Sequence, residues 1–219
     1  MSDSGEGILR RGFLGTGLAA GAGLMAGKGA MASTTAEPGT PLDAGEIVRL
    51  LDLSPNATCG YVRVTFTSPL DIAPGGLPAP FVDGRPLGSA LYFLVTPTAP
   101  VRAHRIRNDQ LYHYYLGDPL EVFLLHADGS AERVVVGPDI RSGQRVQLHI
   151  PGDTFHTARL LGDGAWFLGG STEWPGVVPA EDVEIGNVDA LAASHPSVAA
   201  EIRAIAASVR DTVAPGGPR

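Results

Sequence analysis

The sequence has little positive charge and almost no cysteine. Lys28 is the only lysine among 219 residues; Lys and Arg together number 16 and Asp and Glu number 23, which gives a net charge of −7. Nucleic-acid binding needs clustered Lys and Arg, so this balance argues against a nucleic-acid partner. Cys59 is the only cysteine, so no intrachain disulfide can form.

The sequence also lacks an apolar run long enough to span a bilayer. Residues 12–27 are uncharged and rich in Gly, Ala and Leu, but a spanning helix needs about 20 apolar residues. Arg10-Arg11 precedes this run, and Ala30-Met31-Ala32 follows it as a small-residue cleavage site. This layout is typical of a twin-arginine export signal. We therefore expect residues 1–32 to be an export signal and the protein to be periplasmic or extracellular. No stable membrane span should remain after the signal is removed. The alternative is an uncleaved signal that acts as a membrane anchor.

After the signal, helical patterns are confined to the two ends of the chain. Residues 33–42 form a polar linker with turn chemistry. Residues 43–51 predict a short helix, because apolar residues recur at helical spacing after Asp43, which can cap it. Residues 187–213 also have a helical pattern. We expect one β-domain over residues 43–186 and a helical tail over residues 187–219.

Between these helices, short strands alternate with turns rich in Gly and Pro. Asp128-Gly129 predicts a β-hairpin, residues 104–117 predict two strands joined by a tight turn, and residues 155–161 are expected to pair with residues 166–170. Many short strands with almost no helix between them indicate a barrel or jelly roll. Residues 68–88 predict a long loop, which is either a lid, a partner contact or an insertion without a role.

The stretch from His104 to Gly117 holds the main candidates for a functional site. Because side chains alternate along a strand, Gln110, Tyr112 and Tyr114 share one face, whereas His113 lies on the other. If His104 faces inward on the preceding strand, the turn brings it close to Gln110.

Two stretches resemble the two motifs of the cupin superfamily. His104, Ile106 and Gln110 stand at the positions of the two histidines and the glutamate of the first motif, and Pro151 and His156 stand at the proline and the histidine of the second. A closer resemblance, over about residues 47–201, is to the DUF985 branch of the cupins, also called the cupin_5 family. The matching blocks occur in order at residues 51–55, 60–66, 90–97, 104–105 and 108–122. The chain departs from that family at Asn56-Ala57-Thr58, Gln110 and His156.

This resemblance implies an all-β fold, the cupin double-stranded β-helix or jelly-roll barrel, with the short N-terminal helix and the C-terminal helical tail outside it. It also implies a homodimer and a small-molecule ligand. The apolar strand at residues 87–95 fits either the middle of a sheet or a subunit contact.

The first functional hypothesis is acid–base chemistry of the isomerase, epimerase, lyase or cyclase type. A histidine titrates near neutral pH, and cupin sugar epimerases pair a histidine with a tyrosine, so the candidate catalytic residues are His104, His156, Tyr112 and Tyr114. The candidate ligand-binding residues are Gln110, Tyr61, Arg63, Glu121 and Trp174. Arg63 could also pair with Glu121, and we expect Trp174 to fill the core.

The alternative is a non-catalytic barrel that binds a carbohydrate or a metabolite, so the sequence leaves open whether the protein is an enzyme.

A third hypothesis is a metal-dependent oxygenase. The resemblance implies a divalent metal held by His104, Gln110 and His156, and imidazole ligands suit Zn, Fe, Ni or Cu. Two imidazoles and an amide carry no negative charge, however, so they would give a divalent ion little electrostatic stabilisation. Ile106 also replaces a usual cupin ligand. Both features disfavour the oxygenase.

Overall fold

The structure is a computed structural model that describes residues 41–210. The predicted export signal and nearly all of the predicted linker lie outside the described residues, as do residues 211–219. Within residues 41–210, no helix is both long enough and apolar enough to cross a membrane.

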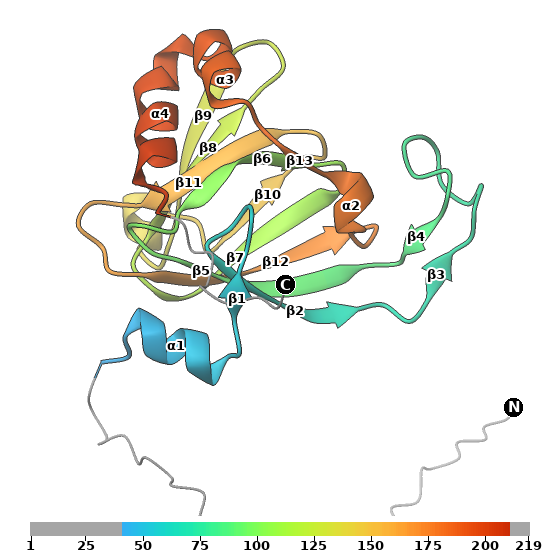
Figure 1. Ribbon diagram of the computed structural model, residues 1–219, viewed down its shortest axis with the longest axis horizontal. Helices are drawn as coiled ribbons and strands as arrows, with labels where there is room; N and C mark the ends of the chain where they lie inside the picture. The colour runs from blue at the N-terminus through green and yellow to red at the C-terminus, as the bar shows by residue number, and fades with distance from the viewer. Residues whose placement is uncertain (1–40, 211–219) are drawn as a thin grey trace, which may run out of the picture. The chain divides into compact units, whose positions relative to one another are not determined.

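Two antiparallel β-sheets face each other and form a sandwich (Figure 1). The first sheet has six strands in the order β1 (Ser54–Pro55), β2 (Tyr61–Thr67), β5 (Ser89–Val95), β12 (Phe167–Trp174), β7 (Asp109–Gly117) and β10 (Gln147–Ile150). The second sheet has five strands in the order β13 (Val183–Ile185), β6 (Val101–Ile106), β11 (Phe155–Leu160), β8 (Leu120–Leu125) and β9 (Ala131–Val136). The prediction of a mostly β fold is confirmed.

The fold predicted as a jelly-roll barrel is present as a β-sandwich, because its two sheets are not closed into one barrel. Single backbone bridges link their edges, at Cys59 with Val101 and at Val136 with Arg145. Strands β3 (Asp71–Ile72) and β4 (Arg85–Pro86) form a separate small ribbon within the predicted loop at residues 68–88.

Two predicted strand pairings are wrong, for one physical reason. Strand β6 lies in the second sheet and β7 in the first, so the turn at residues 107–109 crosses between sheets and closes no hairpin. The buried Asn108 holds this corner, since its side-chain amide donates to the carbonyl of Pro175 at 2.8 Å. Strands β11 and β12 are likewise in different sheets, whereas β8 and β9 pair around Asp128-Gly129 as predicted.

Helices cover the outer faces of the sandwich. Helix α1 (Ala44–Leu50) begins after Asp43, whose carboxylate accepts from the Glu46 amide at 2.7 Å, and it buries Ile47 against the first sheet. Helices α3 (Val188–Ser194) and α4 (Ala199–Ser208), joined by the 3₁₀ turn η2 (Pro196–Val198), pack on the second sheet. Two shorter elements complete the list, η1 (Ile140–Ser142) and α2 (Pro179–Asp182).

Strand β5 is apolar on both faces because both faces are buried. Phe93 and Val95 point into the space between the sheets, and Leu94 points outward against α1. The strand lies between β2 and β12. Its apolar composition is therefore explained by burial in the middle of a sheet, without a subunit contact.

Gly60, just before β2, occupies a position that an alanine would disrupt. Its φ is +43°, and an added Cβ would lie 2.3 Å from the carbonyl oxygen of Leu94 and 2.7 Å from that of Ala99. We expect Gly60→Ala to lower the free energy of unfolding by at least about 2 kcal/mol in urea unfolding. Gly75→Ala is the matched control, because Gly75 has φ +78° but no atom within 4 Å of an added Cβ; it should cost about 1 kcal/mol. Equal losses for the two variants would contradict a steric role for Gly60.

Candidate functional site

A cavity of about 570 Å³ opens between the two sheets. Its apolar wall includes Val62, Leu91 and Phe93 from the first sheet and Ile106 and Val183 from the second. The loop at residues 56–59 and the segment at residues 177–180 complete the lining. This size lies within the range of ordinary small-molecule sites.

One group of polar side chains, which we call the histidine cluster, consists of Cys59, His104, Tyr112 and His156. His104 on β6 and His156 on β11 are direct strand partners, and their ring centroids lie 4.2 Å apart. His104 and Tyr112 line the cavity, whereas His156 is fully buried behind it. The Cys59 sulphur lies 4.0 Å from both His104 Nε2 and Tyr112 Oη.

Backbone contacts determine which nitrogen of each histidine carries a proton. Nδ1 of His104 lies 2.8 Å from the carbonyl oxygen of Arg102, and Nδ1 of His156 lies 3.3 Å from that of Thr154. A carbonyl oxygen can only accept, so both Nδ1 atoms donate, and each neutral ring keeps Nε2 as an acceptor. The Tyr112 hydroxyl then donates to His156 Nε2 at 3.0 Å.

Burial keeps the whole histidine cluster uncharged. It lowers the pKa of His104 to about 4 and that of His156 well below its usual value. Burial also raises the pKa of the Cys59 thiol to about 11 and that of the Tyr112 phenol well above 10. The expectation of a histidine that titrates near neutral pH is therefore wrong, because desolvation disfavours the imidazolium.

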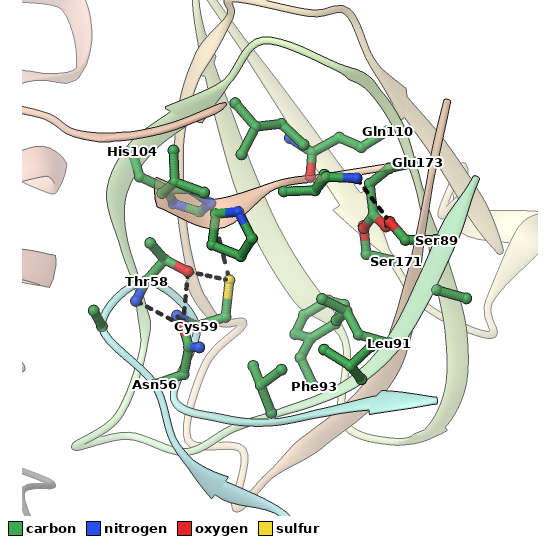
Figure 2. Close-up of a pocket in the computed structure, with 18 of the residues that line it drawn as sticks. Asn56, Thr58, Cys59, Ser89, Leu91, Phe93, His104, Gln110, Ser171 and Glu173 are labelled. Atoms are coloured by element: carbon green, nitrogen blue, oxygen red, sulfur yellow. Dashed lines mark hydrogen bonds between the residues drawn. The ribbon is translucent and has the colours of Figure 1, made fainter. Parts of the chain in front are cut away.

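A second group, which we call the carboxyl cluster, contains Gln110, Glu173, Ser89 and Ser171 (Figure 2). Gln110 on β7 and Glu173 on β12 are direct strand partners, and each is only 3–4% exposed. The Ser89 hydroxyl donates to Glu173 Oε2 at 2.6 Å. Burial raises the pKa of the Glu173 carboxyl, and the bond from Ser89 offsets part of that rise.

The comparisons with known proteins agree with this architecture. The family model described as "Cupin superfamily (DUF985)" matches residues 45–184. The chain belongs to this family. No curated protein matches the chain.

Two solved structures have a similar fold, and a third structure has a lower similarity. A hypothetical protein from Leishmania major is 23% identical with a TM-score of 0.66, and the match covers 75% of this chain and 98% of that one. A protein from Shewanella oneidensis is 22% identical with a TM-score of 0.66, and the match covers 78% and 99%. A cupin-2 domain from Rhodospirillum rubrum is 16% identical with a TM-score of 0.44, and the match covers 67% and 79%.

The donor set of this cupin fits a divalent metal poorly. Among residues 41–210, no cluster of three or more His, Cys, Asp or Glu side chains could hold a metal ion. Nε2 of His156 already accepts from Tyr112, the Gln110 amide is neutral, and Ile106 offers no donor atom. These residues therefore do not supply a suitable metal site.

Several residues predicted for the site lie elsewhere in the fold. The Tyr114 hydroxyl donates to the carbonyl of Gly117 at 2.8 Å, in the core beside Phe167 and beyond the end of the cavity. Tyr61 packs under α1, and the Arg63 guanidinium donates to the carbonyl of Leu51 on the same outer face.

Glu121 and Trp174 also lie outside the cavity. Glu121 is buried on the outer face of β8, where it pairs with Arg159 at 2.9 Å and Arg133 at 3.4 Å, so the suggested pairing with Arg63 is wrong. Trp174 is 53% exposed, so the expectation that it fills the core is wrong as well. As the eighth residue of β12, it points to the outer face opposite Glu173.

Four residues of the cavity were not predicted from the sequence: Glu173, Ser171, Ser89 and Cys59. The predicted strand ended at Gly170, whereas β12 continues to Trp174. Extending the alternation from Phe167 would have placed Ser171 and Glu173 on the inner face. Cys59 precedes β2 in an irregular segment, and no sequence pattern marks it.

The neutral histidines predict acid sensitivity. As pH falls, an imidazole of the unfolded chain protonates near 6.5, whereas His104 in the folded protein protonates only near 4. The unfolded state therefore gains protons first, and the stability present above pH 6.5 is lost as pH falls toward 4. Between pH 7.5 and 5.0 we expect His104 alone to account for a loss of about 2 kcal/mol in the free energy of unfolding, with His156 adding to it.

Urea unfolding of matched variants checks this expectation. His104→Asn should reduce the loss between pH 7.5 and 5.0 by about 2 kcal/mol, because asparagine does not titrate. His149→Asn is the control, since the His149 side chain is 59% exposed. Glu173 is unchanged in both variants, so its opposite pH dependence cancels from the comparison. An unchanged pH dependence in His104→Asn would show that the buried imidazole is not responsible.

Proposed function

We propose that this cupin binds a small organic molecule in the cavity and transfers a proton to or from it, as an isomerase, epimerase, lyase or cyclase does. The observation that carries the proposal is the Glu173 carboxyl, which is buried in a largely apolar wall with a raised pKa. Acid–base catalysts are tuned in this way, because a carboxyl with a pKa closer to neutral exchanges protons more effectively.

The carboxyl cluster supplies the parts for proton abstraction next to a carbonyl group. Glu173 would remove the proton, and the electron pair of the C–H bond would move onto the carbonyl oxygen. The Gln110 amide, the strand partner of Glu173, would donate a hydrogen bond to that oxygen. His104 would accept a hydroxyl hydrogen of the ligand at Nε2, because its Nδ1 hydrogen already bonds to Arg102.

A non-catalytic binding protein is the second candidate, and the histidine cluster favours it. Cys59, His104, Tyr112 and His156 are all held in their neutral forms near pH 7. Neutral hydrogen-bonding groups in an apolar cavity are sufficient to orient a ligand without reacting with it.

Deuterium exchange separates the two candidates. Neutral ketones and α-hydroxyketones, including cyclohexanone and acetoin, would be incubated with the protein in D₂O and followed by ¹H NMR. A proton-transfer enzyme should accelerate exchange of the hydrogens next to the carbonyl of at least one compound, and Glu173→Gln should abolish the acceleration. Saturation-transfer signals without any exchange would instead identify a binding protein.

We also propose that this protein is exported by the twin-arginine route. Export is supported by Arg10-Arg11, the uncharged run after them and Ala30-Met31-Ala32. In a host with a twin-arginine pathway, mass spectrometry should find a mature N-terminus at Ser33, and a double Lys substitution of the two arginines should retain the protein in the cytoplasm. Secretion of the double variant at the normal level would reject this route.

We also propose that the protein is a homodimer. Strand β1 pairs with β2 only at Tyr61 and Val62, so the rest of the β2 edge is unpaired within the described chain, and Val64 and Phe66 are more than half exposed. An apolar, open strand edge favours strand pairing with another chain. Light scattering after size-exclusion chromatography should give twice the monomer mass, and a monomer for the variant Phe66→Lys.

A further inference from the structure

The electrostatic character of the cavity limits the ligands that can enter it. Among the described residues that line the cavity, none is Lys or Arg, and the ionisable carboxyl present is Glu173. A buried anion needs a cation or several hydrogen-bond donors to replace its hydration. The side chains here offer no cation, so an anionic ligand would depend on backbone N–H groups.

Four backbone donors at the rim of the cavity are already used. In the loop at residues 56–59, the amides of Thr58 and Cys59 both donate to the side chain of Asn56, at 2.9 Å and 3.3 Å. Across the cavity, the Val177 amide donates to the Ser89 hydroxyl at 3.2 Å, and the Val178 amide donates to Asp182 at 2.8 Å. These two rim segments therefore do not form an anion-binding nest.

Gln110 and Ser171 are polar side chains in the wall that are left for a ligand. Gln110 is 4% exposed and lines the cavity, and no hydrogen bond joins its amide to another residue of the described chain. A buried amide without a partner is costly, so it is expected to be satisfied when the cavity is occupied. The amide offers two donors and one acceptor, a pattern that a carbonyl, carboxamide or hydroxyl group can match.

We infer that the ligand carries no negative charge and has an apolar body and a carbonyl or carboxamide group bound at Gln110, so that carboxylates and phosphates are excluded. The apolar body lies against Val62, Leu91 and Phe93. This inference rests on the proposed use of the cavity as a ligand site, and it names the substrate class of that site.

Three cyclohexane derivatives of one shape test the inference: cyclohexanecarboxamide, cyclohexanecarboxylate and cyclohexyl phosphate. Dissociation constants would be measured at pH 7.5 by ligand-detected NMR titration on the wild-type protein. We expect the carboxamide to bind at least tenfold more tightly than each charged compound. A carboxylate or phosphate that binds as tightly as the carboxamide would overturn the inference.

A pair of glutamine variants locates the contact. Gln110→Leu should weaken carboxamide binding by about tenfold, because a ligand amide would lose its partner. Gln147→Leu, on the exposed outer face of β10, is the control and should leave binding within twofold. Carboxamide binding that survives Gln110→Leu at the wild-type level would overturn the assignment to Gln110.

The failure of this inference can be told apart from the failure of the proposed function. Deuterium exchange without selectivity for uncharged probes would keep proton transfer and overturn the substrate class. Selectivity for the carboxamide without exchange on any carbonyl compound would keep the substrate class and overturn proton transfer. Absence of binding by all three probes would overturn the substrate class, and absence of exchange on every carbonyl compound as well would overturn both.

Discussion

Replacing Glu173 with Gln is expected to slow deuterium exchange of a responsive ketone by about 10² to 10⁴-fold, because a general base contributes acceleration of that order. Glutamine has the same shape and can still accept the hydrogen bond from Ser89. Binding of the ketone should therefore change little, and the melting temperature at pH 8 should not fall. The rate and the affinity would be measured in the same NMR titration.

The pH dependence adds a second readout for Glu173. Because burial raises the pKa of this carboxyl, the exchange rate should rise with a midpoint above the usual value for a glutamate of 4.5. Glu184→Gln is the matched control, since the Glu184 side chain is 55% exposed and pairs with Arg105; it should leave rate and midpoint unchanged. Exchange at half the wild-type rate or more in Glu173→Gln would remove Glu173 from the mechanism.

Breaking the ion pair between Arg85 and Asp182 is expected to cost about 3–5 kcal/mol in the free energy of unfolding, since it leaves a buried charge without a partner. Asp182 Oδ1 and Oδ2 accept from Arg85 Nη2 at 2.9 Å and Nε at 3.2 Å. The Arg85 side chain is 4% exposed and the Asp182 side chain is 0% exposed. Guanidinium unfolding of Arg85→Met should show this loss.

A hydrophobic double variant provides the control for this ion pair. Arg85→Met combined with Asp182→Leu removes both charges, so most of the stability lost by either single change should return. Glu181 also contacts Arg85 at 2.8 Å, but its side chain is 52% exposed, so we expect Glu181→Gln to cost less than about 1 kcal/mol. A loss below 1 kcal/mol for Arg85→Met would show that the pair does not hold the ribbon β3–β4 and α2 together.

The same ion pair is expected to affect ligand binding. Asp182 ends α2, and Pro179 and Ala180 of this helix line the cavity. Arg85→Met should therefore weaken binding of cyclohexanecarboxamide at temperatures where the variant remains folded. Comparing its binding with that of the double variant shows whether the unpaired charge or the lost packing is responsible.

Local sequence patterns predicted the strands better than their partners. The alternation around Tyr112 and the strand beginning at His156 are both present, because side-chain periodicity is a local property. Pairing depends on which sheet a strand joins after a turn. The turn at residues 107–109 has the composition of a hairpin, yet buried Asn108 anchors it to the carbonyl of Pro175, 67 residues away.

The candidate site, like the fold, was predicted only in part from the sequence. The resemblance to cupins placed His104 and His156 together, and the structure brings their rings to 4.2 Å. Their lowered pKa values could not be predicted, because desolvation depends on packing by strands from both sheets. Arg63 and Glu121 match the family in sequence but serve the outer faces of the sandwich, where one bonds to a backbone carbonyl and the other to two arginines.

The division of the cavity between two sheets has a mechanical consequence. His104 belongs to one sheet and Gln110 and Glu173 to the other, while single bridges at residues 59 and 136 link the sheet edges. A small shear of one layer over the other would change the spacing between these side chains without breaking a ladder inside either layer. Ligands of different length could then be held by the same residues, with the offset between the two sheets as the adjustable dimension.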